Sequence, residues 1–335
     1  MKAVVAHAGE ADVLELAVPE LRDNSVLVKT HYSAVSTGTE LMLLGQSRHK
    51  AEPVYLGYSA AGEVVAVGAG VKHVGVGDRV ACYGSPYVRH AEYLLVPKQL
   101  VVSIPAQVDL REAAFVGLGA IAIHALRQAD LRFGEHVVIV GLGILGQIIA
   151  QVAHAAAFNV LAHDILRDRC RVLQDMGVGR ASHAKEELAQ MIDELTDGEG
   201  VDAVILSTQG GDEALLNQAF KWVRDRGSVL IVGDMNVAFS RELMYEKEAR
   251  VLISRAGGPG RYDERYERDG HAYPIGYVRW TEHRNMYEFI RLLATNRVHL
   301  APLFTHRVPI EEAPQFYRSL IRDERGTALG VIIEY

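Results

Sequence analysis

Two patterns of hydrophobic residues follow one another along the chain. Up to about residue 120, short apolar runs are interrupted by Gly and Pro, as in Val26-Leu-Val-Lys-Thr30, Ala61-Gly-Glu-Val-Val-Ala-Val67 and Asp78-Arg-Val-Ala-Cys82. Short strands separated by turn residues are typical of antiparallel sheets. We therefore predict a compact, mostly antiparallel, barrel-like domain in residues 1–120.

From residue 121 to 256, apolar strand-like runs alternate with amphipathic helix-like stretches. The predicted strands are 136–140, 160–164, 202–207, 228–232 and 250–254. Such alternation indicates a parallel sheet covered by helices on both faces. The chain ends in the apolar run Ala328–Tyr335, so we expect residues 257–335 to return to the first domain as a closing strand. The predicted fold class is α/β, with a β-rich domain and a doubly wound parallel-sheet domain.

A glycine-rich motif follows the first predicted strand of the second domain. Gly141, Gly143 and Gly146 form the spacing G-x-G-x-x-G, with Ile144 and Leu145 opening the next helix. The glycines permit a tight turn, close approach to a pyrophosphate and close helix packing, and the helix N-terminus favours phosphate. Asp164 ends the next strand, where it can accept hydrogen bonds from a ribose diol and repel a 2′-phosphate. We therefore predict NAD(H), rather than NADP(H), as the cofactor.

Residues at the ends of the other strands are expected to line the same cofactor. Strand ends in a doubly wound sheet face the ligand. These positions are Ser207, Thr208, Gly233 and Asp234. Arg169 either covers the adenine, pairs with a phosphate, or is simply a solvated helix residue.

Composition excludes several other classes of protein. The chain has 335 residues, 49% of them hydrophobic, with a net charge of −7 and no long basic stripe, so nucleic acid is not an expected partner. The two cysteines, Cys82 and Cys170, are far apart and give no disulfide framework. No apolar stretch approaches the roughly 20 residues that span a bilayer. We expect a soluble cytoplasmic protein, without a membrane partner, that forms a homodimer or homotetramer.

Several segments resemble signatures of the medium-chain dehydrogenase/reductase superfamily. They are Gly77-Asp-Arg-Val80, Ala91-Glu-Tyr93 with Val96-Pro97, Gly141-Leu-Gly-Ile-Leu-Gly146 and Pro302-Leu-Phe-Thr-His306. The order of segments is also similar. The resemblance implies a GroES-like catalytic domain in 1–120 and 257–335, a Rossmann NAD-binding domain in 121–256, and a dehydrogenase activity.

The zinc-ligand positions of that superfamily carry other residues here. The resemblance places Thr37 at the catalytic Cys, Tyr58 at the His ligand, and the third ligand at or near Gly117. The lobe of four cysteines that binds a structural zinc is also missing. Because catalytic zinc needs three side-chain ligands and an open position, we predict no metal. The alternative by ligand type is a rebuilt site composed of Cys82, His90 and Glu40.

Further motifs resemble a zinc-lacking subgroup of the superfamily. They are Ser36-Thr-Gly-Thr-Glu40, Gly57-Tyr-Ser59, His90-Ala-Glu-Tyr93, Gly257-Gly-Pro-Gly-Arg-Tyr-Asp263 and the segment 273–282. That subgroup includes oxidoreductases associated with sugar and secondary-metabolite pathways. Ser-Thr-Gly-Thr-Glu alone is also similar to the bacteriochlorophyllide dehydrogenases, a resemblance that covers less of the chain.

Without zinc, side chains must manage the proton of the substrate hydroxyl. Tyr58 is expected to point into the former metal pocket, and Thr39 stands where zinc-dependent relatives keep a proton-relaying Ser or Thr. His90 suits general acid/base work near neutral pH, and Glu40 would orient a partner or bind a substrate hydroxyl. Each also has a structural interpretation. Thr39 would hold the loop, Tyr58 would fill the cavity, His90 would be a structural histidine, and Glu40 would balance the helix dipole.

The segment 257–285 is polar, aromatic and rich in turn residues. Long loops with their own aromatic residues are usually functional in compact enzymes. The candidate substrate-binding residues are Arg261, Arg279 and Trp280 from this segment, together with Tyr83 from an earlier loop. The segment is either a lid that binds substrate or an oligomer contact, because Tyr, Trp and Arg also favour interfaces.

The predicted function is a zinc-independent, NAD(H)-dependent dehydrogenase of a secondary alcohol in a sugar, cyclitol or related polyol. Three alternatives remain open. A tetrapyrrole side-chain alcohol dehydrogenase needs a wide cleft, and a metal-free enone or quinone reductase predicts an apolar pocket and NADPH. A catalytically silent NAD-binding module predicts cofactor binding without turnover.

Overall fold

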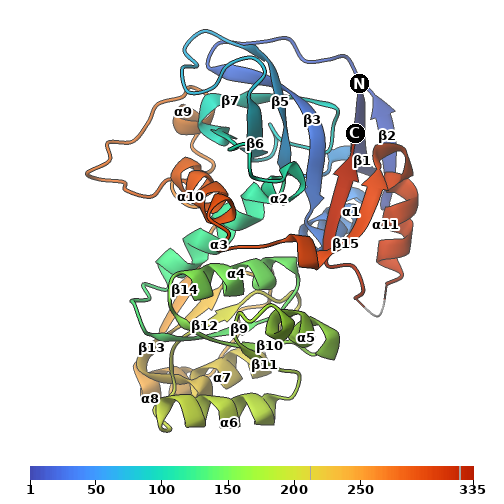
Figure 1. Cartoon of the computed structure of the whole chain (residues 1–335). Coiled ribbons are helices and arrows are strands. Elements are labelled where there is room, and N and C mark those ends of the chain that lie inside the picture. Colours follow the sequence, from blue (N-terminus) through green and yellow to red (C-terminus); the bar gives the residue numbers. More distant parts are fainter. Residues whose placement is uncertain (212, 324–325) are drawn as a thin grey trace. The chain divides into compact units, whose positions relative to one another are not determined.

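The computed structural model describes residues 1–211, 213–323 and 326–335, which form two compact units (Figure 1). One unit comprises Met1–Ala120 with Gly257–Tyr335, and the other comprises Ile121–Ala256. These bounds fall where the hydrophobic pattern changes along the sequence. The predicted α/β fold class is confirmed by the sheets of the two units.

The first unit is built on a seven-stranded sheet in the order β15-β16-β3-β5-β6-β8, with β7 also paired to β3. The strands are β3 (Ser25–Val35), β5 (Ser59–Val67), β6 (Arg79–Tyr83), β7 (Tyr93–Pro97), β8 (Val101–Ser103), β15 (Phe304–Pro309) and β16 (Gly330–Glu334). A small sheet adds β1 (Lys2–His7), β2 (Glu10–Glu15) and β4 (Val54–Tyr55). Every pairing is antiparallel except that of β15 with β16. The antiparallel prediction is therefore confirmed.

The C-terminal strand completes this sheet, as the sequence predicts. Val331 of β16 pairs with Val35 of β3 in antiparallel register. The apolar side chains form two clusters. One contains Val64, Cys82 and Leu100, and the other joins the strands to the helices α1 (Thr37–Ser47) and α11 (Ala313–Ile321).

The second unit contains a six-stranded parallel sheet in the order β11-β10-β9-β12-β13-β14. The strands are β9 (His136–Val140), β10 (Asn159–His163), β11 (Arg180–Ser182), β12 (Val201–Leu206), β13 (Val223–Ile231) and β14 (Arg250–Ile253). Five of them match the predicted strands. The chain leaves β9 in both directions across the sheet, which is the doubly wound arrangement with its switch point beside β9.

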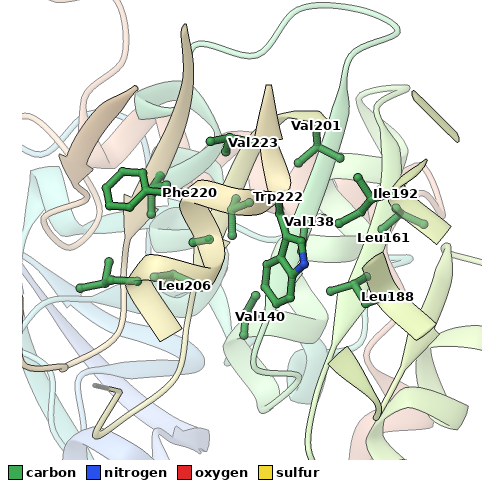
Figure 2. Packing of buried hydrophobic residues seen from close by; sticks show 14 of the residues in the cluster. Val138, Val140, Leu161, Leu188, Ile192, Val201, Leu206, Phe220, Trp222 and Val223 are labelled. Atoms are coloured by element: carbon green, nitrogen blue, oxygen red, sulfur yellow. The ribbon is translucent and has the colours of Figure 1, made fainter. Parts of the chain in front are cut away.

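Helices cover both faces of this sheet (Figure 1). They are α4 (Ile144–Ala155), α5 (Arg167–Asp175), α6 (Lys185–Thr196), α7 (Glu213–Trp222) and α8 (Arg241–Lys247). Figure 2 shows the core on one face, where Leu188 and Ile192 of α6 and Phe220 of α7 pack on Val138 and Leu206. Each of these side chains is almost fully buried. Their burial removes apolar surface from water, which stabilises the unit by about 25 cal/mol per Å².

The helix α3 (Val116–Gln128) crosses the boundary between the units, and α2 (Leu110–Ala113) precedes it. The segment 257–281 contains the single-turn helix α9 (Glu264–Glu267) and leads into α10 (Glu282–Ala294). No helix of the described chain is both long and apolar enough to cross a membrane.

Candidate functional site

Three hydroxyl groups meet at the start of α1 in the first unit. Ser36 is the N-cap residue of α1, and its Oγ donates to Thr39 Oγ1 at 3.2 Å. Tyr58 precedes β5, and its phenol lies close enough to the Ser36 and Thr39 side chains for both to lower its pKa. Burial raises the pKa of Tyr58 to about 12, against the lowering effect of these two hydroxyls. The phenol is therefore protonated at neutral pH and able to donate a hydrogen bond.

Glu40 lies in the first turn of α1 and is fully buried. Its Oε1 accepts the Ser36 backbone N–H at 2.9 Å, so it caps the first turn of α1. Its Oε2 lies 3.0 Å from His90 Nε2 and also accepts from the Tyr317 hydroxyl. A buried carboxylate is stabilised when its lone pairs are filled by donors. Glu40 thus makes the helix-start contact considered from the sequence, and its role in orienting a catalytic partner stays a prediction.

His90 continues this network away from Glu40. Its Nδ1 lies 2.7 Å from Ser33 Oγ, which in turn lies 2.6 Å from the Tyr335 hydroxyl. The His90 side chain is completely buried. Gly57 makes room for it, since a Cβ on Gly57 would lie 2.7 Å from the imidazole. Both ring nitrogens of His90 are therefore engaged in this buried network.

Tyr83 lies between the three hydroxyls of Ser36, Thr39 and Tyr58 and the segment 257–285. Its ring packs edge-on to that of Tyr58, with centroids 6.0 Å apart, and its hydroxyl accepts the Gly257 N–H at 3.0 Å. Burial raises the pKa of Tyr83. Arg261 lies beside the Tyr83 ring, with its guanidinium carbon 5.8 Å from the centroid. The structure thus places Tyr83 next to Tyr58, and Arg261 next to Tyr83.

Arg261 is held by an acidic pair. It donates to Glu267, and both side chains are only 6% exposed. Glu282, at the start of α10, is fully buried, and neither of its oxygens receives a hydrogen bond from a donor group in the described chain. Burial and the charge of Glu267 raise the pKa of Glu282 to about 9, so Glu282 holds a proton at neutral pH.

Arg279 and Trp280 lie elsewhere on the same segment. The Arg279 guanidinium carbon stacks 4.0 Å above the Trp280 ring. The Arg279 backbone oxygen accepts a hydrogen bond from Arg284, which fixes the turn before α10. The role of Arg279 and Trp280 in substrate binding stays a prediction.

The residues at the zinc-ligand positions do not fit a zinc ion. Thr37 and Tyr58 supply hydroxyls, whereas zinc prefers thiolate, imidazole and carboxylate ligands. Cys82 is buried in the strand core, where burial raises the pKa of its thiol. Glu40 and His90 form a hydrogen bond with each other, so they do not form a separate metal site with Cys82. Within the described residues, no three His, Cys, Asp or Glu side chains gather into a group able to hold a metal ion.

The glycine-rich turn of the second unit has the shape that a pyrophosphate requires. Gly141 has φ = +91°, which a residue with a side chain rarely adopts. A Cβ on Gly146 would lie 1.8 Å from the Gly141 carbonyl oxygen, so only glycine lets α4 approach β9 this closely. Gly143 is the N-cap residue of α4, which begins with Ile144 and Leu145. The α4 N-terminus therefore offers free N–H groups beside this turn.

Asp164 lies at the end of β10, beside the same turn. Its carboxylate accepts the backbone N–H groups of Leu142 at 2.6 Å and Leu166 at 2.8 Å. A carboxylate has about four acceptor positions, so acceptor capacity remains for ribose hydroxyls. Arg169 Nη1 lies 3.6 Å from Asp164 Oδ2, and its side chain is 25% exposed. Arg169 is therefore an ion-paired neighbour of the turn rather than a solvated helix residue.

The remaining predicted cofactor residues lie at the same edge of the sheet. Ser207 follows β12 and donates to the Gly141 carbonyl oxygen at 2.7 Å. Thr208 packs on Gly141, and a Cβ on Gly233 would lie 1.8 Å from the Thr208 carbonyl oxygen. The backbone oxygen of Asp234 accepts the Gly210 N–H at 2.9 Å. The ends of β9, β12 and β13 are thus tied together around the switch point.

Sequence reasoning missed several members of these networks. They are Ser33, Tyr317 and Tyr335 around His90, and Glu267 and Glu282 around Arg261. Ser33 and Tyr335 are 302 residues apart in the chain, and no local pattern links them. Glu267 and Glu282 stand in a polar segment, where acidic residues are usually solvated.

Two families of known proteins match the chain. The alcohol dehydrogenase GroES-like domain matches residues 22–106, and the family described as zinc-binding dehydrogenase matches residues 145–268. The chain is 25% identical to D-arabitol-phosphate dehydrogenase of Enterococcus avium over 96% of its length and 93% of that protein. It is 26% identical to sorbitol dehydrogenase of Halalkalibacterium halodurans over 99% of both chains. Alcohol dehydrogenase from Thermus sp. ATN1 has a similar structure, with TM-score 0.80, 25% identity, and coverage of 100% of this chain and 99% of that one.

Proposed function

Because the chain belongs to the medium-chain dehydrogenase/reductase superfamily, we propose that it is a zinc-independent, NAD(H)-dependent dehydrogenase of polyols. The substrate is a secondary alcohol of a sugar, cyclitol or related polyol, or the corresponding ketone in the reverse direction. The names of two relatives support this substrate class, since one acts on D-arabitol phosphate and the other on sorbitol.

The second unit would hold the cofactor. The Gly141–Gly146 turn and the α4 N-terminus would bind the pyrophosphate, and Asp164 would accept the adenosine ribose hydroxyls. The negative charge of Asp164 disfavours a 2′-phosphate, which supports NAD over NADP. Ser207, Thr208, Gly233 and Asp234 would line the remaining cofactor surface. When bound, the nicotinamide supplies the hydride chemistry.

The first unit would manage the proton of the reacting hydroxyl. Tyr58 would donate a hydrogen bond to the substrate oxygen, because its phenol is protonated and part-exposed next to Thr39. In the oxidation, the proton of the substrate hydroxyl would pass through the Ser36 and Thr39 hydroxyls to water at the part-exposed Thr39, and in the reduction it would return by the same route. His90 would act through Glu40, which it holds in place, rather than by touching the substrate. Glu40 in turn fixes the backbone of Ser36.

The observation that carries this proposal is that Thr37 and Tyr58 stand at two zinc-ligand positions, with the Tyr58 phenol beside the hydroxyls of Ser36 and Thr39. The experiment that tests it is NADH formation by the purified protein across sugars, polyols, inositols and their phosphates, with NADP in parallel. Turnover of a polyol with a higher kcat/KM for NAD than for NADP supports the proposal. Tight NAD binding without turnover of any of these compounds would instead favour a catalytically silent module.

A further inference from the structure

Tyr335 follows β16 and reaches the buried network around His90. Ser33 of β3 lies opposite Ile333 of β16 in the antiparallel pairing of these strands. Side chains of opposite residues, and those two positions further along a strand, lie on the same face of the sheet. Tyr335 therefore shares a face with Ser33, and its hydroxyl lies 2.6 Å from Ser33 Oγ. The pairing of the two strands thus places this phenol in the network.

The hydrogen bonds of this network have directions that start from Glu40. A carboxylate only accepts, so His90 Nε2, 3.0 Å from Glu40 Oε2, carries the hydrogen that joins them. In a neutral imidazole the other nitrogen is then an acceptor. The neighbour of Nδ1 is Ser33 Oγ at 2.7 Å, and so Ser33 donates its single hydroxyl hydrogen to His90. The oxygen of Ser33 is left to accept from Tyr335.

Tyr335 is suited to the role of donor in this network. Burial raises the pKa of its phenol, which therefore keeps its hydrogen at neutral pH. Without this donor, the Ser33 hydroxyl would be able to turn and accept a hydrogen from His90 Nδ1. The imidazole would then be an imidazolium, or a tautomer whose Nε2 lone pair faces the Glu40 carboxylate. The Tyr335 hydroxyl therefore selects one hydrogen-bond pattern among these.

Glu40 connects this network to the hydroxyls at the start of α1. Its oxygens accept from three donors, which are the backbone N–H of Ser36, Nε2 of His90 and the hydroxyl of Tyr317. Ser36 Oγ in turn donates to Thr39 Oγ1 at 3.2 Å. Because a buried acceptor that loses a donor is costly, a carboxylate held by three donors has a fixed orientation. A change in the hydrogens of His90 therefore reaches the backbone of Ser36 through Glu40.

We propose that Tyr335 is a positioning residue for the reaction of the dehydrogenase. Through Ser33 it keeps His90 in the neutral form with the hydrogen on Nε2. That form holds Glu40, which in turn holds the first turn of α1 with its hydroxyls. Tyr335 thus acts on the reaction from the far end of the network. The inference rests on the proposed function for its effect on rate, whereas the form of His90 is measured without turnover.

The form of His90 is read by nitrogen NMR of protein with isotope-labelled histidine, and His90→Gln identifies its signals. In the wild type, Nε2 should give a signal of the N–H type and Nδ1 a signal of the unprotonated type. In Tyr335→Phe, the Nδ1 signal should move towards the N–H type, because Ser33 is then able to accept. Tyr32→Phe is the matched control, since Tyr32 is next to Ser33 on β3 and points to the opposite face. It should leave both signals in place.

Steady-state kinetics with the preferred polyol and NAD test the positioning role. Tyr335→Phe should lower kcat about three- to tenfold and leave both KM values within about twofold, as expected when binding is kept and the reacting groups are misplaced. Ser33→Ala should lower kcat by a similar factor. In the double variant, Tyr335→Phe should have no further effect on kcat, because it acts on His90 through Ser33. A purely structural role would lower thermal stability without this coupling.

Three results would overturn the inference. They are His90 signals that are the same in the wild type and in Tyr335→Phe, an unchanged kcat in Tyr335→Phe, and independent effects of the Tyr335 and Ser33 substitutions on kcat. A wild type that oxidises no polyol would overturn the proposed function and, with it, the effect on rate. A form of His90 that depends on Tyr335 in that same protein would still support the hydrogen-bond pattern inferred for the network.

Discussion

His90 Nε2 lies 3.0 Å from Glu40 Oε2, and neither side chain is exposed to solvent. The two residues belong to segments 50 positions apart and join the start of α1 to the loop before β7. Ser33, Tyr317 and Tyr335 complete the network from three other elements. A buried polar network of this kind is costly when one member is removed, because the remaining groups lose partners that water cannot replace.

His90→Ala should therefore destabilise the protein by about 2–4 kcal/mol, from the cavity and from the partners left unpaired. Denaturant unfolding followed by tyrosine fluorescence measures this loss. His49→Ala is the control, since His49 is exposed at the end of α1. Equal stability of the two variants would show that the network does not support the fold.

Tyr58→Phe should lower kcat by about 10²-fold or more while leaving thermal stability nearly unchanged. The Phe ring retains the packing on Tyr83, and only the hydroxyl is lost. The pKa of about 12 keeps the Tyr58 phenol protonated through neutral pH. Below about pH 10, the pH–rate profile of Tyr58→Phe should therefore have the same shape as that of the wild type, at a lower rate. Full activity in Tyr58→Phe would mean that the residue only fills the space of the former metal pocket.

Glu282→Gln should remove a pH dependence of stability. Because the pKa of Glu282 is raised by burial from 4.5 to about 9, the folded protein keeps a proton that the unfolded chain loses above about pH 4.5. Its contribution to stability therefore falls as the pH rises from about 4.5 towards 9. The groups that face it are Glu267 and Arg261, with Tyr83, Tyr266 and Tyr273 nearby.

Thermal unfolding across this pH range measures the effect. At about pH 8 the Glu282→Gln variant should melt roughly 2–4 °C above the wild type, because the amide has no charge to bury. Glu264→Gln is the control, since the Glu264 side chain is 74% exposed. The melting temperature of the wild type should fall relative to that of Glu282→Gln between about pH 5 and 9. A constant difference between the two would contradict a buried, protonated Glu282.

Asp164→Asn should raise the Kd for NAD and bring it closer to the Kd for NADP. Loss of hydrogen bonds to a charged acceptor is worth about 1.5–3 kcal/mol, roughly tenfold or more in Kd. Calorimetric titration with both cofactors measures the ratio. Asp168→Asn serves as the control, because the Asp168 side chain is 92% exposed on the neighbouring helix. An unchanged NAD/NADP ratio would remove Asp164 as the determinant.

The fold could be predicted from the sequence wherever one segment carries a complete signal. The strands β9, β10, β12, β13 and β14 are apolar runs, and the Gly141–Gly146 turn is marked by glycines that only a tight turn and close packing require. The strand β11 was missed because it is only three residues, Arg180-Ala-Ser182, with no apolar run.

The candidate site could be predicted only in part. Tyr58, Thr39, Glu40 and His90 stand in recognisable motifs, and the structure brings them into one region. Their further partners come from distant segments, so the buried state of His90 could not be foreseen. Arg261 donates to Glu267 and to the Ser85 carbonyl oxygen and lies beside the rings of Tyr83 and Tyr262, contacts that the sequence did not indicate; its role in substrate binding stays a prediction. No local sequence pattern predicts that Glu267 and Glu282 are buried, because they stand in a polar segment.

The most direct test of zinc-independent polyol oxidation is the rate of NADH formation before and after exhaustive dialysis against a chelator, with the preferred polyol and NAD. Metal content is measured on the same samples. The account predicts an unchanged rate in metal-free protein and a strongly reduced rate in Tyr58→Phe. Loss of activity on dialysis, restored by added zinc, would contradict it and place a metal ion in the reaction.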